Sequence, residues 1–258
     1  MASTVGAAHY IDVAQVVLYA FWIFFAGLIY YLLKENKREG YPLDSDRSDR
    51  APRVEIQGFP RMPKPKTYLL AHGGTAVAPD FRKDRREIHA RPTAGHPGAA
   101  LEPTGDPLRD GVGPAAYAER SDTPDLTIDG VPRIVPMRVA GDFSIAARDD
   151  DPRGLPVIGA DGGVAGTVRD VWVDRSEVIA RYYELELKGV ATRVLLPVNF
   201  SVIVRQRIEV AAILAQQFAG VPALRSPDQV TRLEEDRIMG YYGGGTLYAT
   251  PSRIGPVL

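Results

Sequence analysis

The sequence predicts a mainly β protein with one N-terminal transmembrane helix, an extended irregular segment, a small antiparallel β-barrel and a late short helix. Three observations support this fold class. A long apolar run lies near the N-terminus, a Gly- and Pro-rich stretch follows it, and short β-branched runs separated by turn residues begin near residue 150. The predicted parts are an N-terminal segment, the helix, the extended segment and the barrel domain, at 1–10, 11–34, 35–115 and 116–258.

Composition narrows the protein class. The chain has 258 residues, 45% hydrophobic and 24% charged, which fits neither a disordered chain nor a polytopic membrane protein. The net charge is −1, and the one basic cluster, residues 82–86, is interrupted by Asp84, so nucleic acid is not a predicted partner. There is no cysteine, which excludes disulfides, thiolate catalysis and Cys-type zinc sites.

The apolar run from Val13 to Leu33 predicts a single membrane span. Its 21 residues carry no formal charge, and as a helix they reach about 30 Å, the thickness of a bilayer's hydrocarbon core. A cleaved signal peptide would carry basic residues before the run, but the first Lys or Arg is Lys34. A buried core helix is the other alternative.

Charges beside the span predict its direction. Lys34, Lys37 and Arg38 follow it, whereas Asp12 precedes it. The positive-inside rule therefore places the large C-terminal part in the cytoplasm and the N-terminus outside it. Tyr10 lies near the predicted outer end, where an aromatic ring suits the interface.

Residues 58–114 are rich in Gly and Pro, which is typical of irregular, extended structure. Composition alone slightly favours a flexible linker. Apolar and aromatic residues nevertheless recur in this stretch, and proline lowers the entropy lost on ordering, so a segment that lies along a partner is the alternative.

The barrel is predicted from a series of short strands. An Asp-Gly-Gly turn at 161–163 precedes a β-branched run, and the next run alternates apolar Tyr183, Leu185 and Leu187 with charged residues. Further strands are expected near 193–204 and 207–214, with Pro197 at an edge or a break. A helix is expected over 226–239, capped by Ser226 with Pro227 at its first position.

The sequence offers little for a catalytic or metal centre. His89 and His96 lie seven residues apart without helical i, i+4 spacing, and Gly73-Gly74 lacks the lysine of a phosphate-binding loop. No nucleophile and base can be paired, which argues against a membrane-bound hydrolase. The acids between 170 and 177 fit either a salt-bridged surface, favoured by their spacing, or a chain of carboxylates that carries protons.

Several longer stretches resemble the H subunit of the purple-bacterial photosynthetic reaction centre. The resemblance spans nearly the whole chain. It rests on AFWIFFAGLIYYL and KREGYPL at the membrane exit, PKPKTYLLAHGGT at 63–75, PTGDPLRDGVGPAAYAER at 103–120, IVPMRVAGDFSIA at 134–146, RDVWVDRSE at 169–177 and LEEDRIMGYYGGGTLYATP at 233–251. The resemblance implies that the strands form the β-barrel named after this complex.

This resemblance implies a non-enzymatic role in a bacterial inner, intracytoplasmic photosynthetic membrane, with the N-terminus in the periplasm. The family's H subunit binds no cofactor alone. It caps two pigment-binding subunits, L and M, whose complex contains bacteriochlorophyll, bacteriopheophytin, quinones, non-haem iron and carotenoid. A cytochrome subunit, a surrounding antenna ring and membrane lipids are further implied partners. The extended segment would then lie on L and M.

The resemblance also implies that the chain helps to conduct protons to the secondary quinone. By match to the family motif, Glu177 resembles the H-subunit carboxylate closest to that quinone, Asp174 its companion, and Arg181 a charge partner. Glu234 is a further candidate.

The sequence departs from the family pattern at the surface where protons are expected to enter. Some members carry histidines there, but residues 124–134 contain none, and Asp125 and Asp129 are the titratable groups available. The competing functional hypothesis for the whole chain is a membrane-tethered β-barrel adaptor without a redox role.

Overall fold

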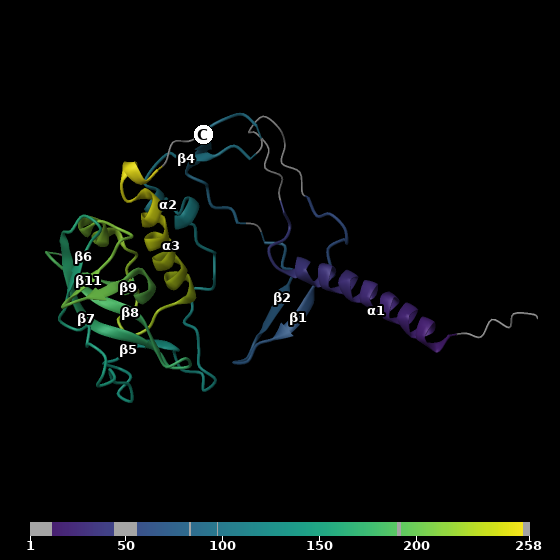
Figure 1. The fold of residues 1–258 in the computed structure, drawn as a ribbon, viewed down its shortest axis with the longest axis horizontal. Coiled ribbons are helices and arrows are strands. Elements are labelled where there is room, and N and C mark those ends of the chain that lie inside the picture. The colour runs from purple at the N-terminus through teal and green to yellow at the C-terminus, as the bar shows by residue number, and fades with distance from the viewer. Residues whose placement is uncertain (1–11, 44–55, 83, 97, 190–191, 255–258) are drawn as a thin grey trace, which may run out of the picture. The chain divides into compact units, whose positions relative to one another are not determined.

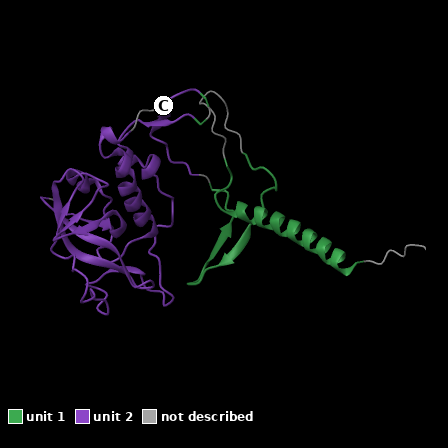
Figure 2. Ribbon diagram, viewed as in Figure 1, with its two compact units in different colours: residues 1–83, 96–98 green, residues 84–95, 99–258 purple. Residues whose placement is uncertain are grey.

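The protein divides into two compact units. The structure, a computed structural model, describes residues 12–43, 56–82, 84–96, 98–189 and 192–254. The predicted periplasmic segment 1–10, with Tyr10, lies outside the described residues. One unit comprises 1–83 and 96–98, and the other comprises 84–95 and 99–258 (Figure 2).

Helix α1, Val13–Glu35, is the N-terminal element (Figure 1). Its cap is Asp12, whose side chain accepts a hydrogen bond from the Ala14 N–H at 3.0 Å. No residue of α1 is buried within the protein, and a long helix that is apolar all round needs a nonaqueous surrounding. By length and composition, the 26-residue segment Val13–Arg38 is a candidate membrane span.

The basic residues at the end of α1 anchor the chain that follows. The short 3₁₀ helix η1, Asn36–Arg38, contains Lys37, which is only 5% exposed. Its ammonium donates to the carbonyl groups of Gln57, Gly58 and Pro60. Arg38 donates to the carbonyl groups of Lys64 and Ala78, each at 2.9 Å. Two of the charges that predict orientation, Lys37 and Arg38, therefore also hold the chain that follows the candidate span.

The segment after the exit is extended and largely exposed. It contains two short antiparallel pairs, β1 (Lys66–Leu69) with β2 (Thr75–Ala78), and β3 (Ala90–Pro92) with β4 (Leu101–Pro103). Helices α2 (Pro107–Asp110) and η2 (Gly113–Ala115) follow. Phe59 and Leu69 are 82% and 87% exposed, so much of the apolar content of this segment is not used to build a core.

A seven-stranded sheet dominates the second unit and confirms the mainly β class. Its strands are β5 (Ile134–Pro136), β6 (Pro156–Ile158), β7 (Val164–Asp174), β8 (Ile179–Leu187), β9 (Arg193–Pro197), β10 (Val202–Val204) and β11 (Arg207–Glu209). The order is β10-β11-β6-β7-β8-β9, with β5 paired to β7. All pairs are antiparallel except β6 with β11.

Strand order and burial agree with most of the sequence pattern. The turn at 161–163 leads into β7, and Pro197 ends β9, which lies at the end of the sheet path. Trp172, Leu185 and Leu196 are fully buried in the core. The expected strand over 207–214 is shorter than predicted, because β11 ends at Glu209 and the chain then turns.

Helix α3, Arg232–Tyr248, corrects both ends of the predicted helix 226–239. The Thr231 side chain accepts from the Glu234 N–H at 3.1 Å, and the Glu234 carboxylate accepts from the Thr231 N–H at 2.8 Å. This reciprocal capping box, rather than Ser226 and Pro227, starts the helix.

The C-terminal half of α3 continues through a glycine-rich stretch because η2 packs directly on its backbone. A Cβ at Gly240 would lie 2.6 Å from the Ala115 carbonyl oxygen, and one at Gly244 would lie 2.5 Å from the Ala115 Cβ. Close packing therefore requires glycine at these positions, which offsets its low helix propensity. Ile238 and Tyr242 of α3 are fully buried in the core.

Candidate functional site

Three strand ends bring the predicted acidic residues together. Asp174 is the last residue of β7, and it lies opposite both Ile134 of β5 and Ile179 of β8. Arg133 directly precedes β5, and Arg181 is the third residue of β8. The sheet register therefore places two guanidinium groups beside the Asp174 carboxylate. We call Asp125, Arg133, Asp174, Glu177 and Arg181 the carboxylate cluster.

Asp174 is the buried centre of the carboxylate cluster. Its side chain is 0% exposed. Arg133 donates to it from Nε at 2.9 Å and forms an ion pair from Nη2 at 2.8 Å. Arg181 donates from Nε and Nη2 at 3.2 and 3.1 Å, and the N–H groups of Ser176 and Glu177 donate at 2.9 and 3.0 Å. Both carboxylate oxygens are therefore well supplied with donors.

These donors decide the charge of Asp174. Burial alone would raise the pKa of Asp174, but hydrogen bonds from Arg133, the two backbone N–H groups and Arg181 outweigh burial and hold the pKa below its ordinary value. Asp174 is thus a fixed negative charge at neutral pH. The idea that burial raises a carboxylate pKa towards neutrality does not describe this residue, because two partly exposed arginines and two backbone N–H groups donate to the buried carboxylate.

Glu177 occupies the exposed side of the carboxylate cluster. Its side chain is 50% exposed, Oε1 accepts from Arg133 Nη2, and Oε2 accepts from Arg181 Nη2 at 2.9 Å. Asp125 joins the cluster through Arg133 Nη1, 3.4 Å from its Oδ2. The cluster thus holds two guanidinium groups against three carboxylates.

This arrangement separates two roles. A guanidinium stays protonated in proteins, so Arg133 and Arg181 position carboxylates but do not carry protons. Glu177 is half exposed and has an oxygen on each arginine, so its carboxylate is held in place where water reaches it. Asp174 fixes the two arginines from the buried side.

Asp129 and Glu234 lie apart from the cluster. Asp129 is exposed in the turn that precedes β5, and in the described part of the chain no hydrogen bond or ion pair joins it to the cluster. Glu234 is 6% exposed and occupied by the capping box and by the Arg225 N–H at 2.8 Å. Its contacts give it a structural role at the start of α3.

Replacing Glu234 tests that role. We expect Glu234→Ala to lower the free energy of unfolding by about 1 kcal/mol, because the Thr231 and Arg225 N–H groups lose their acceptor. Glu234→Gln keeps an acceptor oxygen and should retain most of the stability. Chemical denaturation of the full-length protein in detergent measures both, and an Ala variant as stable as the Gln variant would contradict the capping role.

Two further residues belong beside the predicted site. Arg133 binds three of its carboxylates, but nothing in the local pattern IDGVPRI marks it, since it meets them only through β5–β7 pairing. Glu235 accepts from the Tyr182 hydroxyl at 3.0 Å, and burial raises its pKa. The spacing Thr231-x-x-Glu234, typical of a capping box, is the signal in the sequence that could have separated Glu235 from Glu234. It assigns Glu234 to the helix cap, and Glu235, the next residue, then lies on another face of α3.

Metal ligation is not a feature of the described residues, among which no three His, Cys, Asp or Glu side chains are placed to hold an ion. That the chain carries no cofactor of its own stays a prediction. Arginine side chains and backbone N–H groups donate to the oxygens of the carboxylate cluster. Donors of this kind suit a site that holds negative charge in place.

Family models match two consecutive regions of this chain. Residues 6–139, more than half of the chain, match the model described as photosynthetic reaction centre, H-chain N-terminal region. Residues 145–217 match the PRC-barrel domain. Asp125 and Arg133 lie in the first match, whereas Asp174, Glu177 and Arg181 lie in the second. The cluster is therefore assembled from both matched regions.

Proposed function

The chain belongs to the photosynthetic reaction-centre H-chain family and is an accessory subunit that associates with other reaction-centre subunits. We propose that it caps the L and M subunits and helps protons reach the secondary quinone. The observation that carries the proton role is the half-exposed Glu177 held between Arg133 and Arg181 above a buried, ionised Asp174. The family match favours this role over an adaptor without redox partners.

The proposed placement follows from the span and its flanking charges. We propose that α1 crosses the intracytoplasmic photosynthetic membrane with its N-terminus periplasmic and the sheet unit cytoplasmic. Lys34, Lys37 and Arg38 support this direction. The exposed 56–82 segment, with Phe59 and Leu69 among its uncovered apolar residues, would lie on L and M, so the linker hypothesis becomes an interface hypothesis.

We propose that Glu177 and Glu235 carry protons, whereas Asp174, at the centre of the carboxylate cluster, supplies a fixed negative charge. Glu177 takes a proton at a carboxylate oxygen and gives it up towards the quinone site. Glu235, whose pKa is raised by burial, is the second group that we propose for proton transfer. The complex would supply bacteriochlorophyll, bacteriopheophytin, quinones, non-haem iron and carotenoid, with this chain holding none; a cytochrome subunit and an antenna ring are further proposed neighbours.

Purification through this chain tests its place in the complex. Native membranes are solubilised gently, and the near-infrared spectrum and flash-induced bleaching of the purified sample are recorded. We expect bacteriochlorophyll absorption and bleaching that recovers with quinone-dependent kinetics. A colourless, flash-silent preparation from intact pigmented membranes would contradict the proposal.

Proton entry through the 124–134 segment is tested by Asp125→Asn combined with Asp129→Asn. We expect slower proton uptake after the flash, with most of the effect from Asp125→Asn, because Asp125 contacts Arg133 of the cluster. Uptake is followed with a pH-indicator dye in the purified complex. Asp161→Asn, at the opposite end of β7, is the matched control. Normal uptake in the double variant would place the entrance elsewhere.

A further inference from the structure

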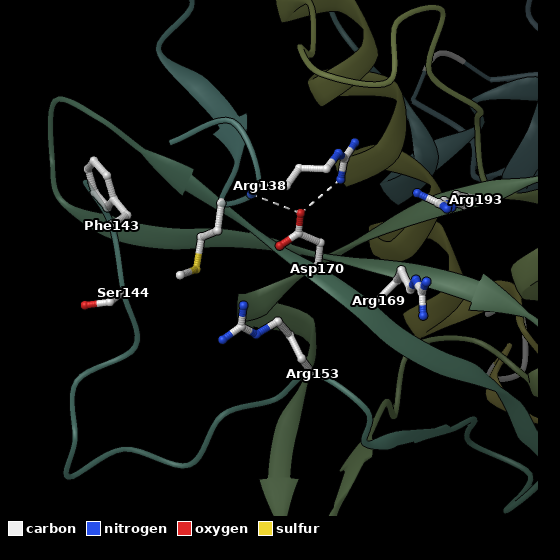
Figure 3. Close-up of a pocket in the computed structure, with 8 residues that line it drawn as sticks. Arg138, Phe143, Ser144, Arg153, Arg169, Asp170 and Arg193 are labelled. Carbon is white, nitrogen blue, oxygen red and sulfur yellow. Dashed lines mark hydrogen bonds and ion pairs between the residues drawn. The ribbon is translucent and has the colours of Figure 1, made fainter. Parts of the chain in front are cut away.

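A second polar site lies in the sheet unit and shares no residue with the carboxylate cluster. It is a hollow of about 510 Å³, within the size range of small-molecule sites. Four arginines from separate segments line it: Arg138 after β5, Arg153 before β6, Arg169 on β7 and Arg193 on β9 (Figure 3). Asp170 is the one carboxylate among its lining residues.

Buried carboxylates hold two of these arginines in place. Glu184, whose side chain is 4% exposed, accepts from Arg138 Nη1 at 2.6 Å and from Arg193 Nη1 at 2.8 Å. Arg138 also donates to Asp170 at 3.0 Å, and the Trp172 indole N–H donates to Glu184 at 2.9 Å. One wall of the hollow is therefore organised before any ligand arrives, which lowers the entropy lost on binding.

The other two arginines have exposed partners. Arg169 has a 63% exposed side chain, and its Nε lies 3.9 Å from Glu186, which is also mostly exposed. Arg153 pairs with Asp151 two residues earlier, and both side chains are close to half exposed. Exposed pairs of this kind contribute about 0–1 kcal/mol each, so a better anion can replace those partners at little cost. Figure 3 shows the Arg153 guanidinium directed into the space beside Asp170.

The charge balance identifies the class of ligand. Arg138 and Arg193 are compensated by the buried Glu184 and Asp170. Among the described residues, Arg153 and Arg169 are paired only with the exposed Asp151 and Glu186, which an incoming anion can displace. A phosphate monoester carries between one and two negative charges near pH 7, and its oxygens suit the guanidinium fork. We propose that this hollow binds a phosphate monoester group.

The remaining lining residues fit the rest of such a ligand. Ser144 offers a hydroxyl, and Met137 and Phe143 offer apolar surface. A phosphate held by arginines with its carbon portion over Phe143 would use both kinds of surface. The phosphate can come from a soluble metabolite or from the headgroup of phosphatidic acid, and the experiment separates these sources.

Calorimetric titration of the full-length protein in detergent tests the proposal. Glycerol 3-phosphate is the soluble probe, with glycerol as its uncharged control, and mixed micelles with phosphatidic acid are compared with phosphatidylcholine micelles. We expect saturable one-site binding that Arg153→Gln combined with Arg169→Gln weakens by about tenfold or more. Arg207→Gln, an exposed arginine paired with Glu209 on β11, is the matched control and should bind normally.

Each outcome decides the proposal. Loss of glycerol 3-phosphate binding in the double variant supports a soluble ligand, and loss confined to phosphatidic acid supports a lipid headgroup. No saturable binding to either probe, or equal weakening by Arg207→Gln, overturns the site. Arg169→Gln alone, at the more exposed position, repeats the test if the melting temperature of the double variant falls.

Discussion

Arg133→Met is expected to lower the free energy of unfolding of the sheet unit by about 3 kcal/mol at pH 7, the low end of the cost of removing one partner from a buried ion pair. Arg133 gives Asp174 two of its shortest contacts, and the Asp174 side chain is fully buried. Arg181 stays in place and keeps the penalty from being larger. Urea unfolding of the full-length Trp22→Phe protein in detergent, followed by the fluorescence of buried Trp172, measures the change.

The penalty should shrink as the pH falls. In the unchanged protein the folded pKa of Asp174 lies below its unfolded value of about 3.9, so the ionised carboxylate stabilises the fold above that value and this stability is lost as pH falls through the folded pKa. Without Arg133, burial dominates and the folded pKa rises. The variant is then penalised most at neutral pH and recovers relative to the unchanged protein towards pH 4.5.

Two controls isolate the charge. Arg207→Met removes an exposed arginine and should change the free energy of unfolding by less than about 0.5 kcal/mol. Adding Asp174→Asn to Arg133→Met removes the uncompensated charge and keeps an acceptor for the Ser176 N–H, so it should restore part of the lost stability. An Arg133→Met penalty that is equal at pH 7 and pH 4.5 would show that Asp174 does not carry it.

Strands β7 and β8 illustrate what local pattern predicts well. The Asp-Gly-Gly turn, the β-branched run and the alternation of Tyr183, Leu185 and Leu187 are all short-range signals, and the structure pairs these strands and buries those three side chains. Neighbouring residues determine these features, so one sequence suffices to find them.

Glu184 shows where the same pattern fails. Alternation assigns it to a polar face with Glu186, yet Glu184 is 3% exposed. It is buried because Arg138 and Arg193, distant in sequence, and the Trp172 indole N–H neutralise and bind it. Such compensation comes from tertiary contacts that periodicity does not contain.

The residues of the carboxylate cluster also differ in whether the sequence alone can reveal them. Asp174 and Glu177 are named by a contiguous motif, RDVWVDRSE, and Arg181 lies on the following strand, so motif matching reaches them. Arg133 enters only through strand pairing. Glu234 and Glu235 are neighbours with different roles, because a helix turns each residue by about 100° and one of them caps the helix. Sequence therefore identifies the acids, and the fold determines which are fixed, exposed or structural.

Glu177→Gln is expected to slow the proton-coupled second reduction of the secondary quinone by about tenfold or more, within the scale of losing a positioned proton-transfer group. Glutamine keeps the side-chain length and one acceptor oxygen for Arg133 or Arg181, but it cannot take up a proton. Primary charge separation should be unchanged, because this chain is proposed to hold no pigment. Two-flash absorption spectroscopy of the purified complex across pH measures both steps.

The matched control is Glu209→Gln, which removes a half-exposed carboxylate from β11 and should leave both steps unchanged. Glu177→Asp keeps a carboxylate on a shorter side chain, so a partial rate in this variant, above that of Glu177→Gln, would assign the effect to proton exchange rather than to the charge of the cluster. A second-reduction rate that stays normal in Glu177→Gln at every pH would remove Glu177 from the route. Glu235 on α3 would then be the next group to replace, because burial raises the pKa of its carboxylate.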